Sequence, residues 1–193
     1  MIVNYPRMRR RAAWPDDLNT ALEFTSPEVF SISAPKNWDG KLEYTNGSGW
    51  ETWDGGAITS GKTGNNYCIY LRGIGNSKIT GVNSRDAKWN IIGTNIACNG
   101  DIDLLLDYST VKSGNRPAMA NECYRYMFYG CTKIKLSTTA SGTYTKAYRI
   151  PKSGTGTTAS SALNNMFANT GGTFTGTPEI NTTYYLDKSN TIV

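Results

Sequence analysis

The sequence predicts a mainly β fold, in which an extended N-terminal arm precedes a small β-sandwich and a short, degenerate β-solenoid-like region. The composition favours the β class, because 20 Gly and 7 Pro suit turns and 12 Tyr suit pleated surfaces. A degenerate repeat favours the solenoid-like region. The run at 121–136, NECYRYMFYGCTKIKL, has a weaker echo at 162–175, ALNNMFANTGGTFT, in which Met166 follows Met127 by 39 residues.

Residues 1–19 form a basic arm rather than a domain. Pro6 and Pro15 interrupt this segment, and four arginines precede its first acidic residue, Asp16. A disordered tail and a peptide that folds on a partner both fit this composition. In the second interpretation, the apolar and basic side chains of the arm are the anchors: Tyr5, Met8, Arg9, Arg10, Arg11 and Trp14. We do not expect nucleic-acid binding, because four charges give only salt-sensitive affinity.

Residues 20–82 predict the β-sandwich module. Alternating or apolar runs separated by turns predict short strands, at 21–25, 29–33, 41–45, 50–53, 57–59 and 67–73. Asn46-Gly47 between two such runs is a strong hairpin signal. The run at 67–73 is the most apolar and is expected to be central, and 61–66 is expected to be a loop.

Residues 83–193 predict the repeat module. Two apolar runs are followed by a buried strand or short helical turn at 102–106, and then by the organising run at 121–136. The length of that run does not separate a short helix from a buried strand. A short helix at 162–167 would be capped by Ser160 or Ser161. Because so few units stack, both ends of the stack need a cover, from the sandwich or from another subunit.

The chain has no histidine, which removes the commonest general base and metal ligand. The four cysteines, at 68, 98, 123 and 131, form no CxxC pair, so no zinc site is expected. Cys123 and Cys131 could pair in an oxidising compartment, or all four could be small buried hydrophobic residues. We therefore expect no enzyme activity, no catalytic residues, no metal and no cofactor.

Three further groups of residues suggest sites, and each also has a simpler structural interpretation. Trp38, Tyr44, Trp50 and Trp53 could form an aromatic platform for sugar rings or a subunit contact, although alternation places Trp50 and Trp53 on opposite faces of one strand. The acidic residues at 101, 103 and 107 lack the glycine and glutamate of a calcium loop and predict a solvated turn. The glycines at 73 and 75 predict a turn rather than a phosphate loop.

Two segments resemble known modules. Residues 42–73, LEYTNGSGWETWDGGAITSGKTGNNYCIYLRG, resemble a module of gut Bacteroidetes surface proteins and of the fibre and appendage proteins of their phages. The residues that carry this likeness are 44–47, Trp50, Trp53 and 69–73. Residues 127–136, MFYGCTKIKL, resemble the core of the surface leucine-rich repeats of gut bacteria and mollicutes, and 166–170 fits that core less well.

The resemblance implies a non-enzymatic structural or binding protein of a bacteriophage virion, such as a head fibre, a capsid decoration or a tail-fibre adaptor. The arm would dock on capsid or tail proteins, and the β modules would project outward as a homotrimer that contacts a host-surface glycan. The alternative is a bacterial cell-surface adhesion or carbohydrate-binding module. No apolar stretch follows the basic cluster or is long enough to span a membrane. We therefore expect assembly in the host cytoplasm and no membrane partner.

Overall fold

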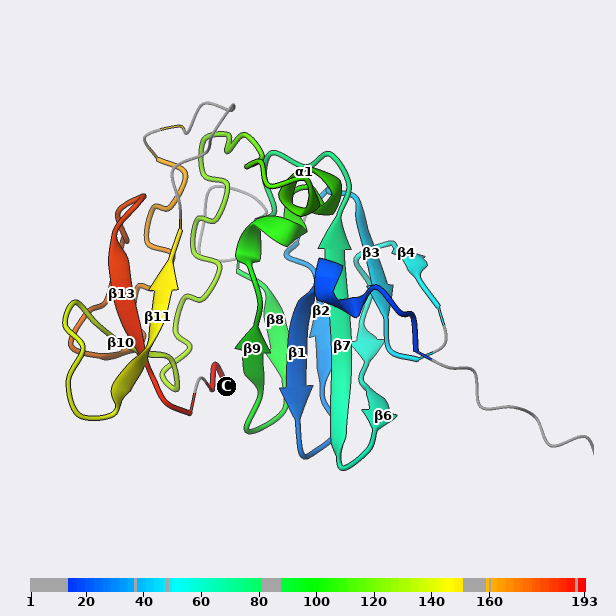
Figure 1. Ribbon diagram of the computed structural model, residues 1–193, viewed down its shortest axis with the longest axis horizontal. Helices are drawn as coiled ribbons and strands as arrows, with labels where there is room; N and C mark the ends of the chain where they lie inside the picture. Colours follow the sequence, from blue (N-terminus) through cyan, green and yellow to red (C-terminus); the bar gives the residue numbers. More distant parts are fainter. Residues whose placement is uncertain are drawn as a thin grey trace, which may run out of the picture.

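The computed structural model describes residues 14–36, 38–47, 49–80, 88–150, 159, 161–189 and 191–193, and they form a mainly β protein (Figure 1). This confirms the mainly β class predicted from the turn-rich composition. The described strands lie in three sheets. In Figure 1 the strands β1–β9 form one group and the strands β10–β13 form a second group beside it.

The largest sheet has the strand order β4-β3-β7-β1-β9, with β6 paired to the first part of β7, and all of these pairings are antiparallel. Its strands are β1 (Leu22–Ser26), β3 (Leu42–Thr45), β4 (Glu51–Trp53), β6 (Gly61–Thr63), β7 (Asn66–Gly73) and β9 (Ala97–Asn99). Strand β7 is central, as its apolar sequence predicts. The segment 61–66 was predicted as a loop, but the two-residue turn Gly64-Asn65 lets β6 fold back onto β7.

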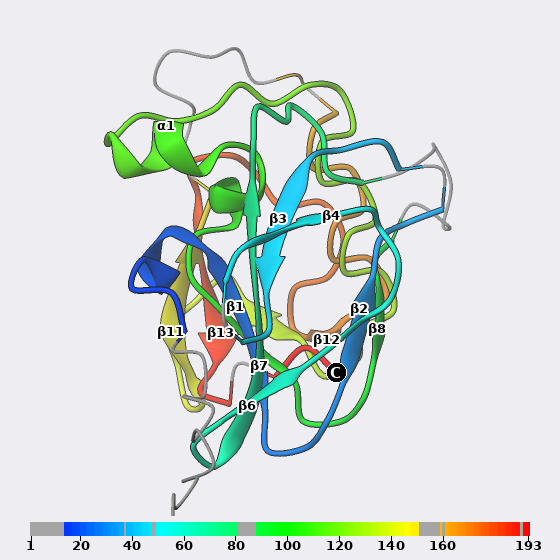
Figure 2. The same ribbon diagram turned by 90° about the vertical axis from the view of Figure 1, so that its right-hand side faces the viewer.

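A three-stranded sheet covers the inner face of the largest sheet. It has the order β5-β2-β8, formed by β5 (Ile58–Thr59), β2 (Ser31–Ser33) and β8 (Asn90–Ile92). Figure 2 shows β2 and β8 as a second layer beside β1, β3 and β7. Alternate side chains such as Phe24, Ile32 and Ile69 are buried between the layers, which gives the sandwich its core.

Short helical segments pack at one end of the strands of the largest sheet. They are the 3-10 helices η1 (Leu18–Thr20) and η3 (Ile102–Leu105) and the α-helix α1 (Tyr108–Lys112). The side chain of Asp101 accepts a hydrogen bond from the Asp103 N–H, and Asp107 caps α1 through the Thr110 N–H at 2.8 Å. Of the two structures predicted for 102–106, the short helical turn is therefore confirmed.

The predicted repeat forms two stacked coils of consecutive turns, which we call coil one (120–131) and coil two (161–170). Alternate N–H groups of coil one bond within the coil, and the others donate to carbonyls of coil two. Examples are Tyr124 N–H to Ala162 C=O at 2.8 Å and Phe128 N–H to Met166 C=O at 3.0 Å. The rings of Phe128 and Phe167, 39 residues apart, stack at 5.6 Å. The helix predicted at 162–167 is therefore wrong. Alternate N–H groups there donate to the carbonyl three residues earlier, whereas those of Asn165 and Phe167 donate to Thr177 and Gly176 in the segment after β12.

A third sheet continues the coils. It has the order β11-β13-β10-β12, formed by β10 (Lys135–Ser137), β11 (Tyr144–Arg149), β12 (Gly171–Gly172) and β13 (Thr183–Asp187). Strands β10 and β12, which follow the two coils, pair in parallel, as successive turns of a solenoid do. The remaining pairings in this sheet are antiparallel.

Both ends of the two-coil stack are covered by the chain itself. On one side, the Ile79 N–H donates to the Cys123 C=O at 3.1 Å and the Ala120 N–H donates to the Ser77 C=O at 2.9 Å. On the other side, Phe167 and Gly176 exchange two backbone hydrogen bonds. The cover that the sequence required therefore comes from the loop after β7 and from the segment after β12.

The two groups of strands share one hydrophobic core. Strands β8 and β9, which follow residue 82, complete the two sheets of the sandwich. Ile192, only 4% exposed, lies in the same cluster of buried side chains, where its N–H donates to the Ile96 C=O at 2.7 Å. The predicted module boundary at residue 82 lies outside the described residues.

Candidate functional site

The outer face of the largest sheet carries a set of polar and aromatic side chains. Because side chains alternate along a strand, burial of Ile69 and Leu71 in the core leaves Tyr70 and Arg72 of β7 on the outer face. Glu43 of β3 lies opposite Arg72, and Glu23 of β1 lies opposite Tyr70. This face is the candidate functional site.

Arg72 is the centre of a clamp that holds residues 14–20 against the sheet. Its Nη1 donates to Asp17 at 2.6 Å, and its Nε donates to Glu43 at 2.7 Å. The guanidinium lies 3.8 Å from the ring centroid of Trp50 and 4.2 Å from that of Tyr108. Arg72 is therefore only 6% exposed while its charge is fully paired.

Asp17 joins the clamp through two neighbours. Its Oδ1 accepts a hydrogen bond of 2.8 Å from the indole N–H of Trp50, and its Oδ2 faces Arg72. The Trp50 hydrogen bond lowers the pKa of Asp17 below 3.8, against the opposing effect of burial and with the help of Arg72. Trp14 adds an edge-to-face contact with Tyr70, at 5.5 Å between ring centroids. The end of the arm is thus fixed on the outer face.

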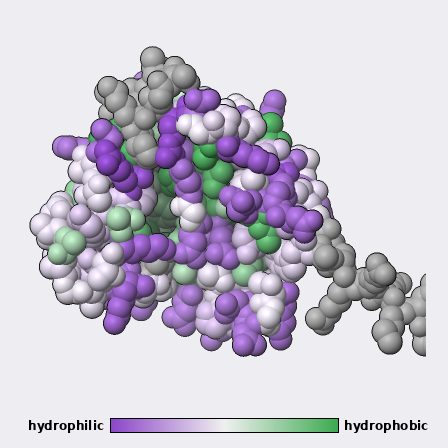
Figure 3. Space-filling model, viewed as in Figure 1, coloured by the Kyte–Doolittle hydropathy of each residue, from purple (hydrophilic) through white to green (hydrophobic). Residues whose placement is uncertain are grey.

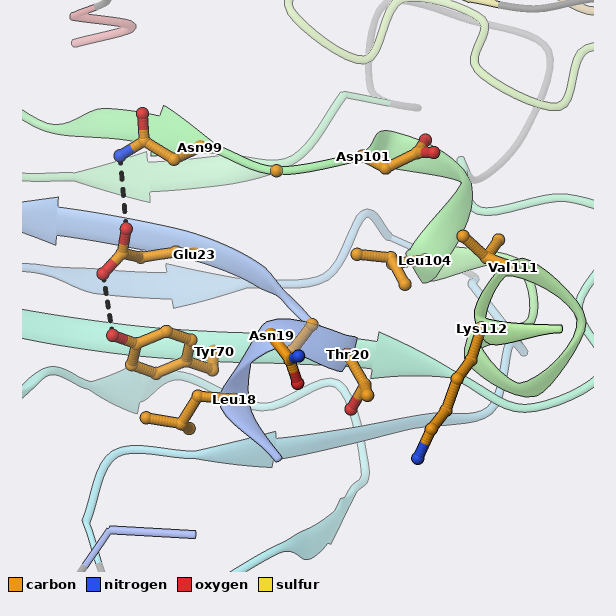
Figure 4. A pocket seen from close by; sticks show the side chains of 12 residues that line it. Leu18, Asn19, Thr20, Glu23, Tyr70, Asn99, Asp101, Leu104, Val111 and Lys112 are labelled. Atoms are coloured by element: carbon orange, nitrogen blue, oxygen red, sulfur yellow. Dashed lines mark hydrogen bonds between the residues drawn. The ribbon is translucent and has the colours of Figure 1, made fainter. Parts of the chain in front are cut away.

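Beside the clamp lies an open depression of about 620 Å³ (Figure 4). On its floor, the Tyr70 hydroxyl donates to Glu23 Oε1 at 2.7 Å, and Asn99 Nδ2 donates to Glu23 Oε2 at 3.3 Å. Lys146 of the neighbouring β11 donates to Asn99 Oδ1 at 2.8 Å, which links the floor to the repeat region. Burial and the Glu23 carboxylate raise the pKa of Tyr70, so its proton stays on the hydroxyl.

The walls of the depression come from the short helical segments. Figure 4 shows Leu18 and Asn19 of η1 on one side and Leu104, Val111 and Lys112 of η3 and α1 on the other. Asn19 and Lys112 are exposed, whereas Leu104 is buried. The depression therefore combines a polar floor with walls of mixed character.

The residues predicted as the anchoring arm are described only in part. Tyr5, Met8, Arg9, Arg10 and Arg11 lie outside the described residues. Trp14 is half-buried on Tyr70. Their role in anchoring stays a prediction.

The four residues predicted as a ligand or subunit contact are not brought together. Trp38 and Trp53 pack with Trp89 at centroid distances of 5.5–6.2 Å, in an aromatic cluster at the edge of the sandwich core. Trp50 lies on the opposite face over Arg72, which confirms the prediction from alternation. Tyr44 donates to Glu51 across the β3–β4 hairpin at 2.8 Å. The structure thus assembles no common platform from these four.

The acidic residues near position 101 do not form a solvated turn. Asp103 is fully buried, where it accepts hydrogen bonds from the Tyr124 hydroxyl at 2.7 Å and from Arg116 Nη1 at 2.9 Å. Asp101 pairs with the same arginine. Burial raises the pKa of Asp103, although Tyr124 and Arg116 oppose this. The prediction was wrong because local sequence does not show that coil one covers this carboxylate.

The remaining sequence candidates have structural roles. Cys68, Cys123 and Cys131 are free thiols, and Cys68 and Cys123 are buried. Gly75 adopts a φ of 63° in a turn where its N–H donates to Asp107, which confirms the turn predicted there. Among the described residues, no group of three or more acidic, cysteine or histidine side chains could hold a metal ion. The helices within the described ranges are all too short or too polar to cross a membrane.

No family model, curated protein or solved structure matches the chain. The candidate site therefore rests on its geometry. Sequence reasoning missed Asp17, Glu23, Tyr70, Arg72 and Asn99. The alternation in 67–73 could have placed Tyr70 and Arg72 on one outer face, but the long-range pairs, such as Asp17 with Arg72, left no local signal.

Proposed function

We propose that this chain is a non-enzymatic attachment protein of a bacteriophage virion, anchored through its N-terminal arm. The observation that carries the proposal is the clamp on residues 14–20. Asp17, Trp50 and Arg72 fix the point at which the arm joins the β body. A basic segment joined to a β body at a fixed point suits a structural anchor, because the body then follows the orientation of whatever holds the segment.

The shared core also supports this proposal. The sandwich and the coils bury side chains in one cluster, and Lys146 and Asp103 make polar contacts between them. The β body would thus project from the virion as a single unit. Its expected partners are capsid or tail proteins, a second and third copy of the chain, and a glycan on the host surface.

The test is incorporation into particles. We expect a chain that lacks residues 1–13 to fold with an unchanged melting temperature, since Trp14 and the clamp are retained, and to be absent from purified particles. Two triple variants with the same loss of charge test whether the position of the charges matters. Incorporation should fall when the arm arginines Arg9, Arg10 and Arg11 are changed to Gln. It should not fall when the exposed lysines Lys62, Lys133 and Lys188 are changed to Gln. Normal incorporation of the truncated chain would refute the anchoring role.

A bacterial cell-surface carbohydrate-binding module is the second candidate. The depression beside Glu23 favours it, because a concave site with a polar floor serves binding without requiring a virion. The neighbouring genes discriminate the two candidates. Capsid, portal or tail genes beside this one would support the virion, and a lipoprotein or export signal upstream and in frame would support the cell surface.

A further inference from the structure

We propose that the depression between η1, β1, β7, β9 and α1 binds a neutral, polyhydroxylated ligand, namely one or two sugar rings of a glycan. This inference deepens the proposed function, since it gives the attachment protein a ligand and a binding face. It assigns that face to the depression rather than to the tryptophans of the β3–β4 hairpin, which the structure separates between the core and the clamp.

The floor supplies oriented hydrogen-bond acceptors. Within the part of the chain that the structure describes, each oxygen of the Glu23 carboxylate accepts one bond, from Tyr70 or from Asn99. A carboxylate oxygen has two acceptor sites, so each retains one for a ligand hydroxyl. The two bonds hold the carboxylate in place before a ligand arrives, which lowers the entropy lost on binding. Hydroxyl donors to a carboxylate also form stronger bonds than donors to neutral groups.

The walls supply the complementary groups. Asn19 and Lys112 are exposed at the rim and can donate to ring or hydroxyl oxygens. Leu18, Leu104 and Val111 line the same depression with aliphatic surface. A sugar ring presents hydroxyl groups at its edge and C–H groups on its faces, so it can use both kinds of wall at once.

The charged side chains and the volume of the depression indicate which class of ligand fits it. An acidic ligand would meet the Glu23 carboxylate on the floor, and a cationic ligand would meet Lys112 at the rim. Asp101, a second carboxylate in the lining, pairs with Arg116, which it shares with Asp103. A neutral ligand avoids both repulsions. The volume of about 620 Å³ lies within the range of roughly 300–1,000 Å³ that is common for ligand pockets, and the open shape leaves room for the ends of a longer chain.

Figure 3, which shows the same face as Figure 1, supports a polar rather than a lipidic ligand. Hydrophilic residues cover much of this face, and apolar surface appears in the furrow between the two groups of strands. A pocket between β9 and β11 holds only about 100 Å³ and is lined mainly by apolar side chains, Phe128 and Phe167 among them. It is too small for a sugar ring with its hydroxyl groups, so it does not compete with the depression as a sugar site.

The test uses the full chain and a panel of neutral disaccharides: maltose, cellobiose, lactose, mannobiose and chitobiose. We expect at least one to shift the backbone amide NMR signals of residues 18–23, 99–101 and 111–112, with a Kd measurable by titration. Glu23→Gln should weaken that binding about tenfold or more, because it removes the negative charge and replaces one acceptor oxygen with an NH2 donor. Asn19→Trp, at an exposed rim position, should fill the depression and abolish binding.

Glu51→Gln is the matched control. Glu51 also accepts a hydrogen bond from a tyrosine hydroxyl, that of Tyr44 at 2.8 Å, but it lies outside the depression, so its variant should bind normally. Three results would overturn the proposal: no binding by the whole panel, signal shifts confined to another surface, or full affinity in folded Asn19→Trp. Stronger binding of an acidic disaccharide would overturn the neutral class.

This test separates the inference from the proposed function. Glu23→Gln should still be incorporated into particles, because the arm is intact. The chain without residues 1–13 should still bind the disaccharide, because the depression is formed by described residues that it retains. Absence of sugar binding by the natural chain would refute the inference and leave the anchoring proposal intact. Normal incorporation of the chain without residues 1–13 would refute the anchoring proposal and leave the inference intact.

Discussion

Arg72 lies at an outer-face position of β7, yet its side chain is covered because Trp50 and Tyr108 lie against its guanidinium. Its partners differ in exposure, with the side chain of Asp17 43% exposed and that of Glu43 24% exposed. Solvent therefore screens the Asp17 pair more than the Glu43 pair. Removal of the arginine would leave two carboxylates near each other without a cation.

Arg72→Gln is predicted to lower the free energy of unfolding by about 3 kcal/mol, the lower end of the range for breaking a buried ion pair, because Asp17 is partly solvated. Denaturant titration followed by tryptophan fluorescence measures the change. Lys62→Gln is the control, since that exposed lysine lies 5.9 Å from the Tyr67 ring and should change stability by less than about 0.5 kcal/mol. Equal effects of the two substitutions would contradict the clamp.

The stability that the clamp contributes depends on pH through the carboxyl group of Asp17. The Trp50 hydrogen bond lowers its pKa in the folded state below the ordinary value of 3.8. The stability that Asp17 contributes is therefore complete above about pH 5 and is lost as the pH falls through the folded pKa. We expect Asp17→Asn to be less stable than the natural chain at pH 7 and the gap to narrow below pH 3.8. A gap that is constant from pH 7 to pH 2.5 would be inconsistent with this.

At the level of elements, β7 and η3 approach so closely that only glycine fits at Gly73. A Cβ at this position would lie 1.8 Å from the carbonyl oxygen of Leu105, which belongs to the backbone and cannot rotate away. A Cβ at Gly47, in the turn between β3 and β4, would have no neighbouring atom within 4 Å. The two glycines therefore differ in what surrounds them rather than in backbone conformation.

Gly73→Ala is predicted to destabilise the fold by about 1–3 kcal/mol or more, through overpacking. Gly47→Ala should change stability by less than about 0.5 kcal/mol. Thermal melts of the two variants under one buffer give the comparison. If Gly73→Ala melted at the temperature of the natural chain, the close packing of β7 on η3 would be disproved.

Alternation predicted sandwich strands such as β1, because burial on one face imposes a period of two, whereas the apolar run of β7 marked it as the central strand. The coils were not predictable in the same way. Their geometry depends on a left-handed φ at non-glycine residues, including Tyr126 at 56° and Asn165 at 54°, which sit 39 residues apart. A tyrosine in this conformation has no sequence signature. The offset was predicted correctly, but the local structure that it repeats was not.

The candidate site was less predictable than the strands. Its residues come from separate parts of the chain: Asp17 contacts Arg72, and Glu23 contacts Tyr70 and Asn99. Such contacts depend on strand order, which short-range patterns do not determine. The aromatic residues that stood out in the sequence, Trp38 and Trp53, instead fill the core.

At the scale of the whole molecule, the shared core predicts a single unfolding transition. All 5 tryptophans lie within residues 14–89 and report on the sandwich, whereas Cys123 is buried in coil one and reports on the repeat region. Tryptophan fluorescence and thiol labelling of Cys123 should give the same denaturation midpoint in urea. Two separate midpoints would show that the groups of strands fold independently.

The pairing of residues 191–193 with the β9 edge has a consequence for the protein while it is being synthesised. Thr191 bridges to Ala97, and Ile192 and Val193 bond to Ile96, so within the described part of the chain the outer edge of β9 is covered by a segment that is translated after all of the described strands. Until the ribosome has delivered that segment, a nascent chain leaves that edge bare, and bare edges pair with those of neighbouring chains. A cell that makes many copies at once would need chaperones or rapid release to keep them apart.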